Sequence, residues 1–260
     1  MKIATWNVNS IRTRLPQVQD WLISNSLDVL CIQETKVIDQ DFPKTPFESL
    51  GYHVYISGQK SYNGVAILSK QPLTNVSTGF TPILGESYTP LDEQKRLITG
   101  TIQNISIINV YVPNGASLTD AKYEYKLTWL KALNAYLQQL IQAKNQICIC
   151  GDFNIALEDK DIYKPDNKNN HIMSSPPERE ALKSILALGL NDVFRKFTPD
   201  TGYYTWWDYR TKAFYRNSGW RIDHIYMTEE LSDRTLTCII DTTPRKLPQP
   251  SDHAPVVVEI

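Results

Sequence analysis

Residues 97–112 read LITGTIQNISIINVYV and show the pattern of paired strands that recurs along the chain. Two apolar, β-rich runs, Leu97–Ile102 and Ile105–Val112, lie on either side of the turn signal Gln103-Asn104. This pattern predicts two strands joined in a hairpin-like pair. The next segment differs, because Tyr123 begins a run of apolar residues at helical spacing that continues to Ile141. Paired strands and helices therefore both occur at the centre of the chain.

The same two patterns recur from this stretch outward to both termini. Helical spacing begins at Ile11 and again after Pro176, where Gly189 is expected to end the helix. A helix follows a strand only intermittently, whereas hairpin-like pairs are common. We therefore expect an α/β fold in which two mixed β-sheets pack face to face with helices outside. The other runs that we expect to be strands are Lys2–Val8, Val29–Gln33, Tyr52–Ser57, Val65–Ser69, Ile147–Cys150, Tyr203–Trp207, Arg221–Thr228, Leu236–Ile240 and Pro255–Glu259.

Two segments without periodicity, the polar Lys160–Ser175 and the proline-rich Pro244–Pro250, are expected to be surface loops. Core-like strands lie on both sides of each segment, so neither is expected to link two domains. A chain of 260 residues is within the size that one hydrophobic core supports. Residues 1–260 are therefore expected to form a single domain.

The composition is that of a globular protein, and its net charge is not that of a protein that binds nucleic acid through overall positive charge. Hydrophobic residues make up 42% of the chain, charged residues 21%, and the formal net charge is −1. No apolar run approaches the roughly 20 residues that cross a bilayer, and the strand-like start leaves no room for a signal peptide. We therefore expect a cytoplasmic location. The cysteines lack C-x-x-C spacing and are expected to be buried free thiols; they are Cys31, Cys148, Cys150 and Cys238.

Polar residues recur where the expected strands end. Side chains alternate along a strand, so Asn7 and Asn9 share a face, and so do Asp152 and Asn154. Taken singly, each such residue is best explained as a turn residue that bonds its own backbone. Several carboxylates clustered in a partly buried site would repel one another without a cation, so the combination favours an active site. The set comprises Asn7, Asn9, Glu34, Asn109, Tyr111, Asn114, Asp152, Asn154, Asp223, Asp252 and His253.

The chemistry of this set points to metal-assisted phosphoester hydrolysis. Its ligands are hard oxygens without a cysteine or multi-histidine pattern, which favours magnesium or manganese over zinc. Asp152 is suited to deprotonate a water molecule, and His253 to carry charge beside a phosphate, with Asp223 fixing its tautomer. The chain has no Gly-x-Ser-x-Gly motif, which disfavours covalent acyl chemistry.

Six motifs carry these residues: TWNVNSIR (5–12), QETK (33–36), YVPNG (111–115), GDFNIA (151–156), GWRIDH (219–224) and SDHAP (251–255). Together they resemble the motif series of the exonuclease III family of apurinic/apyrimidinic endonucleases. The resemblance runs from residue 3 to 260. Short blocks such as SDH also occur across the wider endonuclease/exonuclease/phosphatase superfamily. The stretch WWDYR (206–210), followed by GWRID, is more specific to the DNA-repair branch.

The resemblance implies a four-layer α/β sandwich with the active site between its two sheets. It also implies a Mg²⁺ site, with Mn²⁺ as the alternative. Glu34 would be the main ligand, and the full set of expected ligands is Asn7, Glu34, Asp152, Asn154, Asp252 and His253.

The resemblance further implies catalytic roles. Asp152 would activate the water, and Asn154 would position it or stabilise the pentacovalent phosphate. Asp223 would pair with His253, which faces the phosphate. Tyr111 would donate a hydrogen bond to the phosphate or lower the barrier electrostatically.

Another part of the resemblance concerns the substrate. It implies that Trp206, Trp220 and Ile222 form a small apolar pocket for a sugar without its base. A cavity too small for a normal nucleotide is a physical means of detecting a missing base. Alternation along the strand predicts that Trp207 instead packs between the sheets. We expect the substrate contacts beside this pocket to come from Asn114, Arg210, Lys212, Arg216 and Arg221. Further phosphate contacts are expected from Lys36, Lys95, Arg96, Lys122 and Lys126. For Lys122 and Lys126, a solvated helix face is an equally good explanation.

Two departures from the family pattern concern DNA handling and charge. Asn9 stands where some family members carry Asp, so Glu34 is expected to bear more of the neutralisation of the metal charge. Residues 115–118 read Gly-Ala-Ser-Leu, without an arginine to insert into the duplex.

The expected function is hydrolysis of the phosphodiester 5′ to abasic sites in duplex DNA, with 3′-to-5′ exonuclease and 3′-end-cleaning activity at the same centre. The expected partners are duplex DNA with abasic sites or 3′ ends and no membrane, and the expected state is a monomer. Two alternatives stay open at this point. One is a phosphatase of the same superfamily acting on small or lipid phosphoesters, which would not need Trp206 or Trp220. The other is a non-catalytic DNA-binding module.

Overall fold

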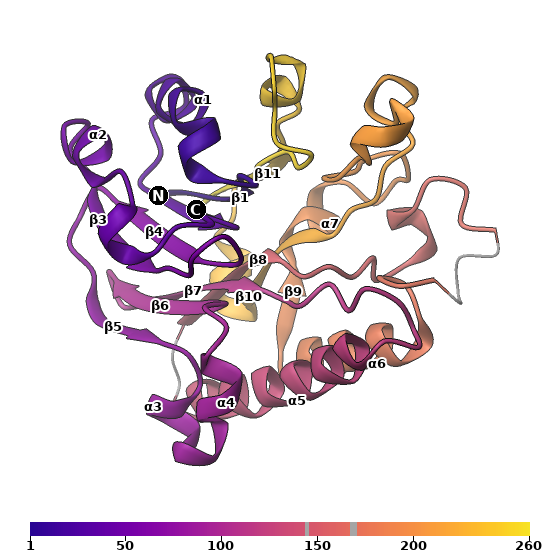
Figure 1. The fold of residues 1–260 in the computed structure, drawn as a ribbon. Helices are drawn as coiled ribbons and strands as arrows, with labels where there is room; N and C mark the ends of the chain where they lie inside the picture. Colours follow the sequence, from indigo (N-terminus) through magenta and orange to yellow (C-terminus); the bar gives the residue numbers. More distant parts are fainter. Residues whose placement is uncertain (144–145, 167–170) are drawn as a thin grey trace.

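Two six-stranded sheets stack face to face in the computed structural model, which describes residues 1–143, 146–166 and 171–260 (Figure 1). Sheet A has the strand order β11-β12-β1-β2-β4-β3, and sheet B the order β5-β6-β7-β8-β10-β9. The strands of sheet A are β1 (Lys2–Asn7), β2 (Val29–Gln33), β3 (His53–Ser57), β4 (Val65–Ser69), β11 (Thr237–Ile240) and β12 (Val256–Glu259). Those of sheet B are β5 (Thr74–Thr78), β6 (Leu97–Ile102), β7 (Ile105–Tyr111), β8 (Gln146–Asp152), β9 (Leu190–Asp192) and β10 (Asp223–Thr228).

Both sheets are mixed, as the sequence predicts. The pairs β1–β2 and β7–β8 are parallel, and a long helix connects the two strands of each pair: α1 (Ile11–Asn25) or α5 (Ala121–Gln142). A parallel connection needs such a crossover, whereas a hairpin needs only a turn. The strands β6 and β7 form the expected hairpin, which closes on the pair Ile102 and Ile105.

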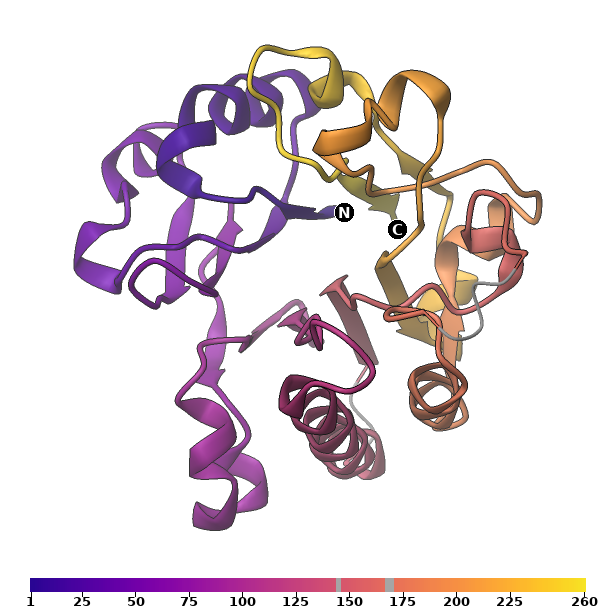
Figure 2. The same cartoon turned by 45° about the vertical axis from the view of Figure 1, so that its right-hand side comes forward.

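Helices cover the outer face of each sheet, which gives the four layers (Figures 1 and 2). Helices α1 and α2 (Lys44–Glu48) pack on sheet A, and α5 and α6 (Pro176–Leu186) pack on sheet B. Neighbouring residues of β1 show the consequence, since Ile3 is buried between the sheets and Ala4 is buried under α1. A strand covered on both faces is apolar throughout, which explains the continuous apolar runs in the sequence.

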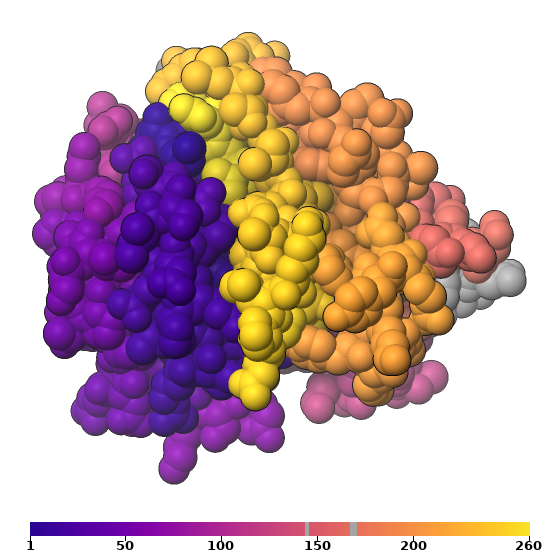
Figure 3. All heavy atoms as spheres, turned by 90° about the horizontal axis from the view of Figure 1, so that it is seen from above, coloured from indigo at the N-terminus to yellow at the C-terminus, as the bar shows by residue number. Residues whose placement is uncertain are grey.

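The ends of the chain lie next to each other, because β1 and β12 are antiparallel neighbours. Figure 3 shows the first and last segments, indigo and yellow, side by side on one face. This pairing brings the end of β1 close to the segment that precedes β12. The remaining helices are short: α3 (Thr81–Leu84), α4 (Thr89–Asp92), α7 (Val193–Phe197), α8 (Glu229–Asp233), and the 3₁₀ turns Asp39–Asp41, Glu86–Tyr88, Asp159–Asp161, Tyr209–Thr211, Phe214–Arg216 and Thr243–Lys246.

Two expectations about local structure were wrong, and two strands were not expected. Tyr203–Trp207 is not a regular strand, because Trp206 makes isolated bridges to Trp220 and His253 instead of joining a sheet. The strands β5 and β9 were missed, since β5 is a mostly exposed, bulged edge strand without alternation and β9 has three residues. Lys160–Ser175 is not simply a surface loop, because Asp161, Ser174 and Ser175 are buried; its residues 167–170 lie outside the described residues.

The four cysteines are buried and free, as expected, in the apolar layer between the sheets. Among the helices of the described residues, none combines the length and apolar character needed to cross a membrane.

Candidate active site

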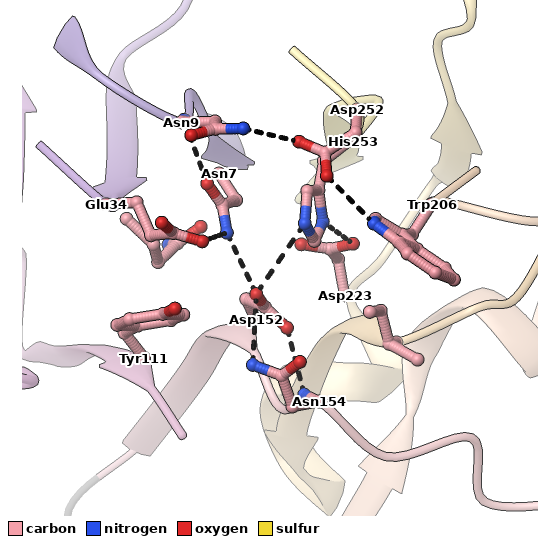
Figure 4. Close-up of polar contacts among 12 residues, drawn as sticks. Asn7, Asn9, Glu34, Tyr111, Asp152, Asn154, Trp206, Asp223, Asp252 and His253 are labelled. Atoms are coloured by element: carbon pink, nitrogen blue, oxygen red, sulfur yellow. Dashed lines mark hydrogen bonds and ion pairs between the residues drawn. The ribbon is translucent and has the colours of Figure 1, made fainter. Parts of the chain in front are cut away.

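The expected catalytic residues lie together at one edge of the sandwich, where strands of both sheets end (Figure 4). In sheet B, Asp152 of β8 is in register with Tyr111 of β7 on one side and with Asp223 of β10 on the other. Sheet A supplies Asn7, the last residue of β1, and Glu34, which directly follows β2. Three strands of one sheet therefore present a row of polar side chains to two strand ends of the other.

Asp152 lies at the centre of this group and is 1% exposed. Its Oδ2 accepts a hydrogen bond from Nδ2 of Asn7 at 2.9 Å and one from Nδ2 of Asn154 at 3.3 Å, and its Oδ1 accepts the backbone N–H of Asn154 at 2.9 Å. Burial, assisted by the nearby carboxylates of Asp223 and Glu34, raises the pKa of Asp152 to about 7. A carboxylate with this pKa accepts protons near neutral pH.

His253 lies between two carboxylates. Its Nδ1 is 2.8 Å from Oδ2 of Asp223, and its Nε2 is 3.8 Å from Oδ2 of Asp152. Burial alone would lower the pKa of His253, but Asp223 and Asp152 outweigh it and raise that pKa to about 10. A protonated imidazole has two N–H donors and no lone pair for a metal ion. The ion pair with Asp223 keeps His253 charged and fits its expected role beside the phosphate, with Nε2–H as the donor.

Glu34 is held by an amide and an ammonium group. Its Oε1 accepts a hydrogen bond from Asn7 at 2.9 Å, and its Oε2 is 2.8 Å from Nζ of Lys36. Burial would raise the pKa of Glu34, but Lys36 and Asn7 outweigh it and lower that pKa. Glu34 is therefore ionised and able to bind a cation.

The donor set fits a hard divalent ion. One ligand atom from each of Glu34, Asp152 and His253 lies within 4.8 Å of the others. Asn7 donates to both carboxylates through the same Nδ2, which draws two like charges together in a buried site. The two carboxylates repel each other in this arrangement unless they share a cation. The carboxylates of Glu34 and Asp152, with the Asn7 amide beside them, are thus suited to hold Mg²⁺.

Asp252 lies one step away from this cluster. Its Oδ1 accepts from Nδ2 of Asn9 at 2.9 Å, and its Oδ2 accepts from Nε1 of Trp206 at 3.0 Å. The amide of Asn9 thus connects Asp252 to Lys36, whose Nζ donates to Oδ1 of Asn9. Asp252 therefore links the residues around Glu34 to the aromatic residue Trp206.

Tyr111, Asn114 and Asn154 form the other wall. Nδ2 of Asn114 donates to Oδ1 of Asn154 at 2.9 Å. Burial and the carboxylates of Glu34 and Asp152 hold the pKa of Tyr111 well above its ordinary value, so its hydroxyl keeps its proton as a donor. The guanidinium of Arg96 lies over the Tyr111 ring, 4.6 Å from its centroid.

The aromatic residues gather next to Asp252. Trp206 and Trp220 exchange backbone hydrogen bonds of 2.9 Å, and both pack with Ile222 against a small apolar cluster that includes Ala156 and Met173. The ring of His171 is 5.4 Å from the Trp220 ring. The three residues expected to form a pocket therefore do share one wall.

Trp207 is buried, as expected, but in a different place. It is 1% exposed and packs with Tyr204, Ala213 and Ala254 in a cluster of its own rather than between the two sheets.

Two of the cations expected to contact phosphate do not lie at a surface. Arg221 is 1% exposed, and its guanidinium bonds Asp161 and Asp192 at 2.7 Å each. Its neighbours Trp220 and Ile222 pack in the apolar cluster beside Trp206, whereas the Arg221 side chain turns away to these two carboxylates. Lys126 is 0% exposed and pairs with Glu178. Arg210 does lie outside, with its side chain 87% exposed and paired to Asp208.

The described residues also line a cavity of about 590 Å³ that begins at Tyr111 and Asn114 and is bordered by Arg96 and Lys122. The cavity is open to solvent, and Trp206, Trp220 and Ile222 are not among the residues that line it. Its cationic border is suited to contact further phosphates of an extended substrate.

Sequence reasoning missed one residue that shapes the site. Oγ1 of Thr205 accepts the backbone N–H groups of both Ile222 and Asp223 at 3.0 Å, which fixes the pocket wall and the partner of His253 together. Its position directly before WWDYR was the available signal.

The chain belongs to the Endonuclease/Exonuclease/phosphatase family, whose profile matches residues 4–253. It is 35% identical to exodeoxyribonuclease III of Haemophilus influenzae, with 100% of this chain and 99% of that protein covered. The resemblance read from the motifs is thus confirmed.

Two solved structures are also similar over the whole chain. The AP endonuclease from Archaeoglobus fulgidus has a TM-score of 0.94 and 44% identity, with 100% of this chain and 99% of that chain covered. A 3′ phosphatase from Neisseria bound to a product DNA hairpin has a TM-score of 0.95 and 39% identity, with the same coverage. Both similarities confirm the α/β sandwich.

Proposed function

We propose that the protein is a metal-dependent DNA-repair nuclease that cleaves the phosphodiester 5′ to abasic sites in duplex DNA and leaves a 3′-hydroxyl. The observation that carries this proposal is the buried carboxylate of Asp152, held between two amides beside a charged His253. The same centre serves 3′-to-5′ exonuclease and 3′-end-cleaning reactions. Relatives that are an exodeoxyribonuclease III, an AP endonuclease and a 3′ phosphatase support this range.

Asp152 acts as the general base. Asn7 and Asn154 fix the direction of its carboxylate, and its pKa of about 7 places it where proton transfer from water is efficient near neutral pH. Asn154 also lies beside the attacking position, since its side-chain amide contacts Oδ2 of Asp152. The water that attacks phosphorus gives its proton to Asp152.

His253 and Tyr111 stabilise the charge that grows on the phosphate oxygens. The imidazolium is oriented by Asp223, so that Nε2–H points toward the space beside Asp152. Tyr111 keeps its hydroxyl proton and donates from the opposite wall. Donors fixed before the reaction need no reorganisation in the transition state.

The metal is Mg²⁺ in this proposal, with Mn²⁺ as a substitute. Glu34 and Asp152 would hold the ion, with the Asn7 amide beside them. Of the other expected ligands, Asn154 contacts Asp152 and Asp252 lies one step away, bonded to Asn9. When bound, the ion supplies positive charge to the phosphate and the leaving oxygen.

The DNA specificity rests on the wall of Trp206, Trp220 and Ile222. This wall is apolar and adjoins the catalytic group through the Trp206–Asp252 hydrogen bond, so a sugar without its base would lie against it while the phosphate meets His253. Arg210 and the cations that border the large cavity would contact flanking phosphates.

The test uses a duplex that contains one tetrahydrofuran abasic analogue. We expect incision 5′ to the analogue with Mg²⁺, none with chelator, and incision slowed by about 10³- to 10⁴-fold with Asp152→Asn. The matched control is Asp233→Asn, which alters an exposed carboxylate at the end of α8 and should cleave like the wild type. Absence of incision by the wild type in Mg²⁺ or Mn²⁺ would overturn the proposal.

The same assay separates the alternatives. Turnover of small phosphomonoesters above that of DNA would favour a phosphatase. Of the relatives above, one is a 3′ phosphatase, and it is bound to a product DNA hairpin. DNA binding that is insensitive to metal, without turnover, is expected of a non-catalytic module. A monomeric state and a cytoplasmic location complete the proposal, and sedimentation and cell fractionation test them.

A further inference from the structure

Lys126 is a buried charge that the proposed reaction does not use. It lies on the inner face of α5 and is 0% exposed. A lysine is rarely buried without a partner, because removing an ammonium group from water is costly. The position of its Nζ therefore calls for an explanation.

Three acceptors surround this Nζ. They are Oε1 of Glu178 at 2.5 Å, the backbone oxygen of Asn154 at 2.8 Å and the backbone oxygen of Asn114 at 3.2 Å. An ammonium group has three N–H donors, so each donor has one acceptor. Two of the three acceptors belong to residues of the active-site wall.

The two asparagines need such a partner. Asn154 has a φ of 50°, in the left-handed region that costs free energy for a residue with a Cβ. Its backbone N–H and its side chain both bond Asp152, and Asn114 donates to its Oδ1 at 2.9 Å. A cation that binds both backbone oxygens fixes the geometry of the whole chain of contacts from Asn114 to Asp152.

Glu178 holds the ammonium group in place. Besides Lys126, its carboxylate accepts the backbone N–H groups of Met173 and Ser175 at 3.0 Å each, and the hydroxyl of Ser175 at 2.6 Å. Ser175 caps α6, and Glu178 is in its first turn. Lys126 is thus anchored to the start of a helix, and its other two donors face the active site.

We propose that Lys126 is a positioning residue for the reaction, which fixes Asn154 and Asn114, and through them the base Asp152. This inference rests on the proposed function. Joining α5 to α6 would not require the pair, because Leu130, Leu133, Leu182 and Ile185 already pack there. Buried ion pairs also add little net stability compared with apolar groups.

The test compares Lys126→Met with the double variant Lys126→Met/Glu178→Gln. The single variant leaves a buried carboxylate unpaired, so it should lower the melting temperature. The double variant removes the charge from both partners and should recover most of that loss. We expect kcat on the abasic duplex to fall by roughly 10- to 100-fold in both, with KM changed less than about threefold. Lys131→Met is the control, because Lys131 is an exposed lysine on the same helix.

Hydrogen exchange gives a second readout that does not depend on activity. Peptides that cover 112–116 and 152–156 should exchange faster in the double variant than in the wild type or in Lys131→Met. If the double variant is as stable as the wild type and retains its kcat and its exchange rates, the Lys126–Glu178 pair only connects α5 to α6 and the proposal fails. If the wild type does not cleave DNA but the exchange rates rise as expected, the positioning role stands and the proposed function falls.

Discussion

Two buried clusters of charge lie close together in this protein, and they are built in opposite ways. In one cluster, two carboxylates meet two guanidinium groups: Asp161, Asp192, Arg195 and Arg221. In the other, the active-site cluster, three carboxylates meet one imidazole and one partly exposed lysine: Glu34, Asp152, Asp223, His253 and Lys36. The first cluster is balanced, whereas the second has more negative than positive charge.

The pKa shifts report this difference. Burial would raise the pKa of both Asp152 and Asp161. At Asp161, Arg221 outweighs burial and holds the pKa well below its ordinary value. At Asp152, no guanidinium of the described residues is in contact, and the pKa is raised to about 7. A fold keeps an unbalanced buried cluster where a ligand supplies the missing charge, so the active-site cluster is built for binding and the balanced one for structure.

The largest expected effect comes from Asp152→Asn. We expect kcat on the abasic duplex to fall by about 10³- to 10⁴-fold, because the base is lost. Stability at pH 8 should be unchanged or higher, because a buried carboxylate with a raised pKa is removed. Single-turnover kinetics and urea unfolding measure the two quantities. A large loss of stability would show that Asp152 belongs to the structural type of cluster after all.

The balanced cluster should respond in the opposite sense. Arg221→Met leaves Asp161 and Asp192 unpaired and should lower the free energy of unfolding by about 3–5 kcal/mol. Arg210→Met is the matched control, since the Arg210 side chain is 87% exposed and its loss should change stability by less than about 0.5 kcal/mol. Equal effects of the two changes in urea unfolding would contradict the structural role of Arg221.

The third effect concerns the charge that the active-site cluster lacks. Mg²⁺ at 100 times its Kd should stabilise the wild type by about 2.7 kcal/mol, because the ion binds the folded state. Glu34→Gln should remove most of this gain. Thermal unfolding with Mg²⁺ and with chelator checks it, and Arg210→Met should keep the full gain. An undiminished gain in Glu34→Gln would place the ion elsewhere.

The contrast between the clusters also explains what could be predicted from sequence. The strand ends carrying Glu34, Asp152 and His253 could be read because apolar runs stop there and motif order is specific. The prediction that Arg221 contacts phosphate was wrong. Its motif places a cation next to Trp220 and Ile222, but it does not show that the side chain points away from them. The prediction for Lys126, a phosphate contact or a solvated helix face, was also wrong. A lysine on a helix is usually solvated, and the sequence does not show that this one points inward. The partners that bury these cations, Asp161 and Glu178, are 60 and 52 residues away along the chain, and no local pattern marks such pairs.

The last expected effect is a difference between two aspartates in the sign of their pH dependence, which changes stability by at most ~1.4 kcal/mol per pH unit. The pKa of Asp161 is lowered by folding, so its contribution to stability is present above pH ~4 and is lost as the pH falls further, by at most ~1.4 kcal/mol per pH unit. Asp161→Asn should therefore be less stable than the wild type at pH 7, and this difference in the free energy of unfolding should narrow toward pH 3.

The pKa of Asp152 is raised to about 7, so its burial costs more stability as the pH rises from ~4 through 7. Asp152→Asn should accordingly gain on the wild type over that range, measured with chelator so that no ion supplies the missing charge. Urea unfolding at pH 3, 5 and 8 distinguishes the two curves. If both gaps changed in the same direction with pH, the two carboxylates would be in the same kind of environment and the contrast between balanced and unbalanced charge would not hold.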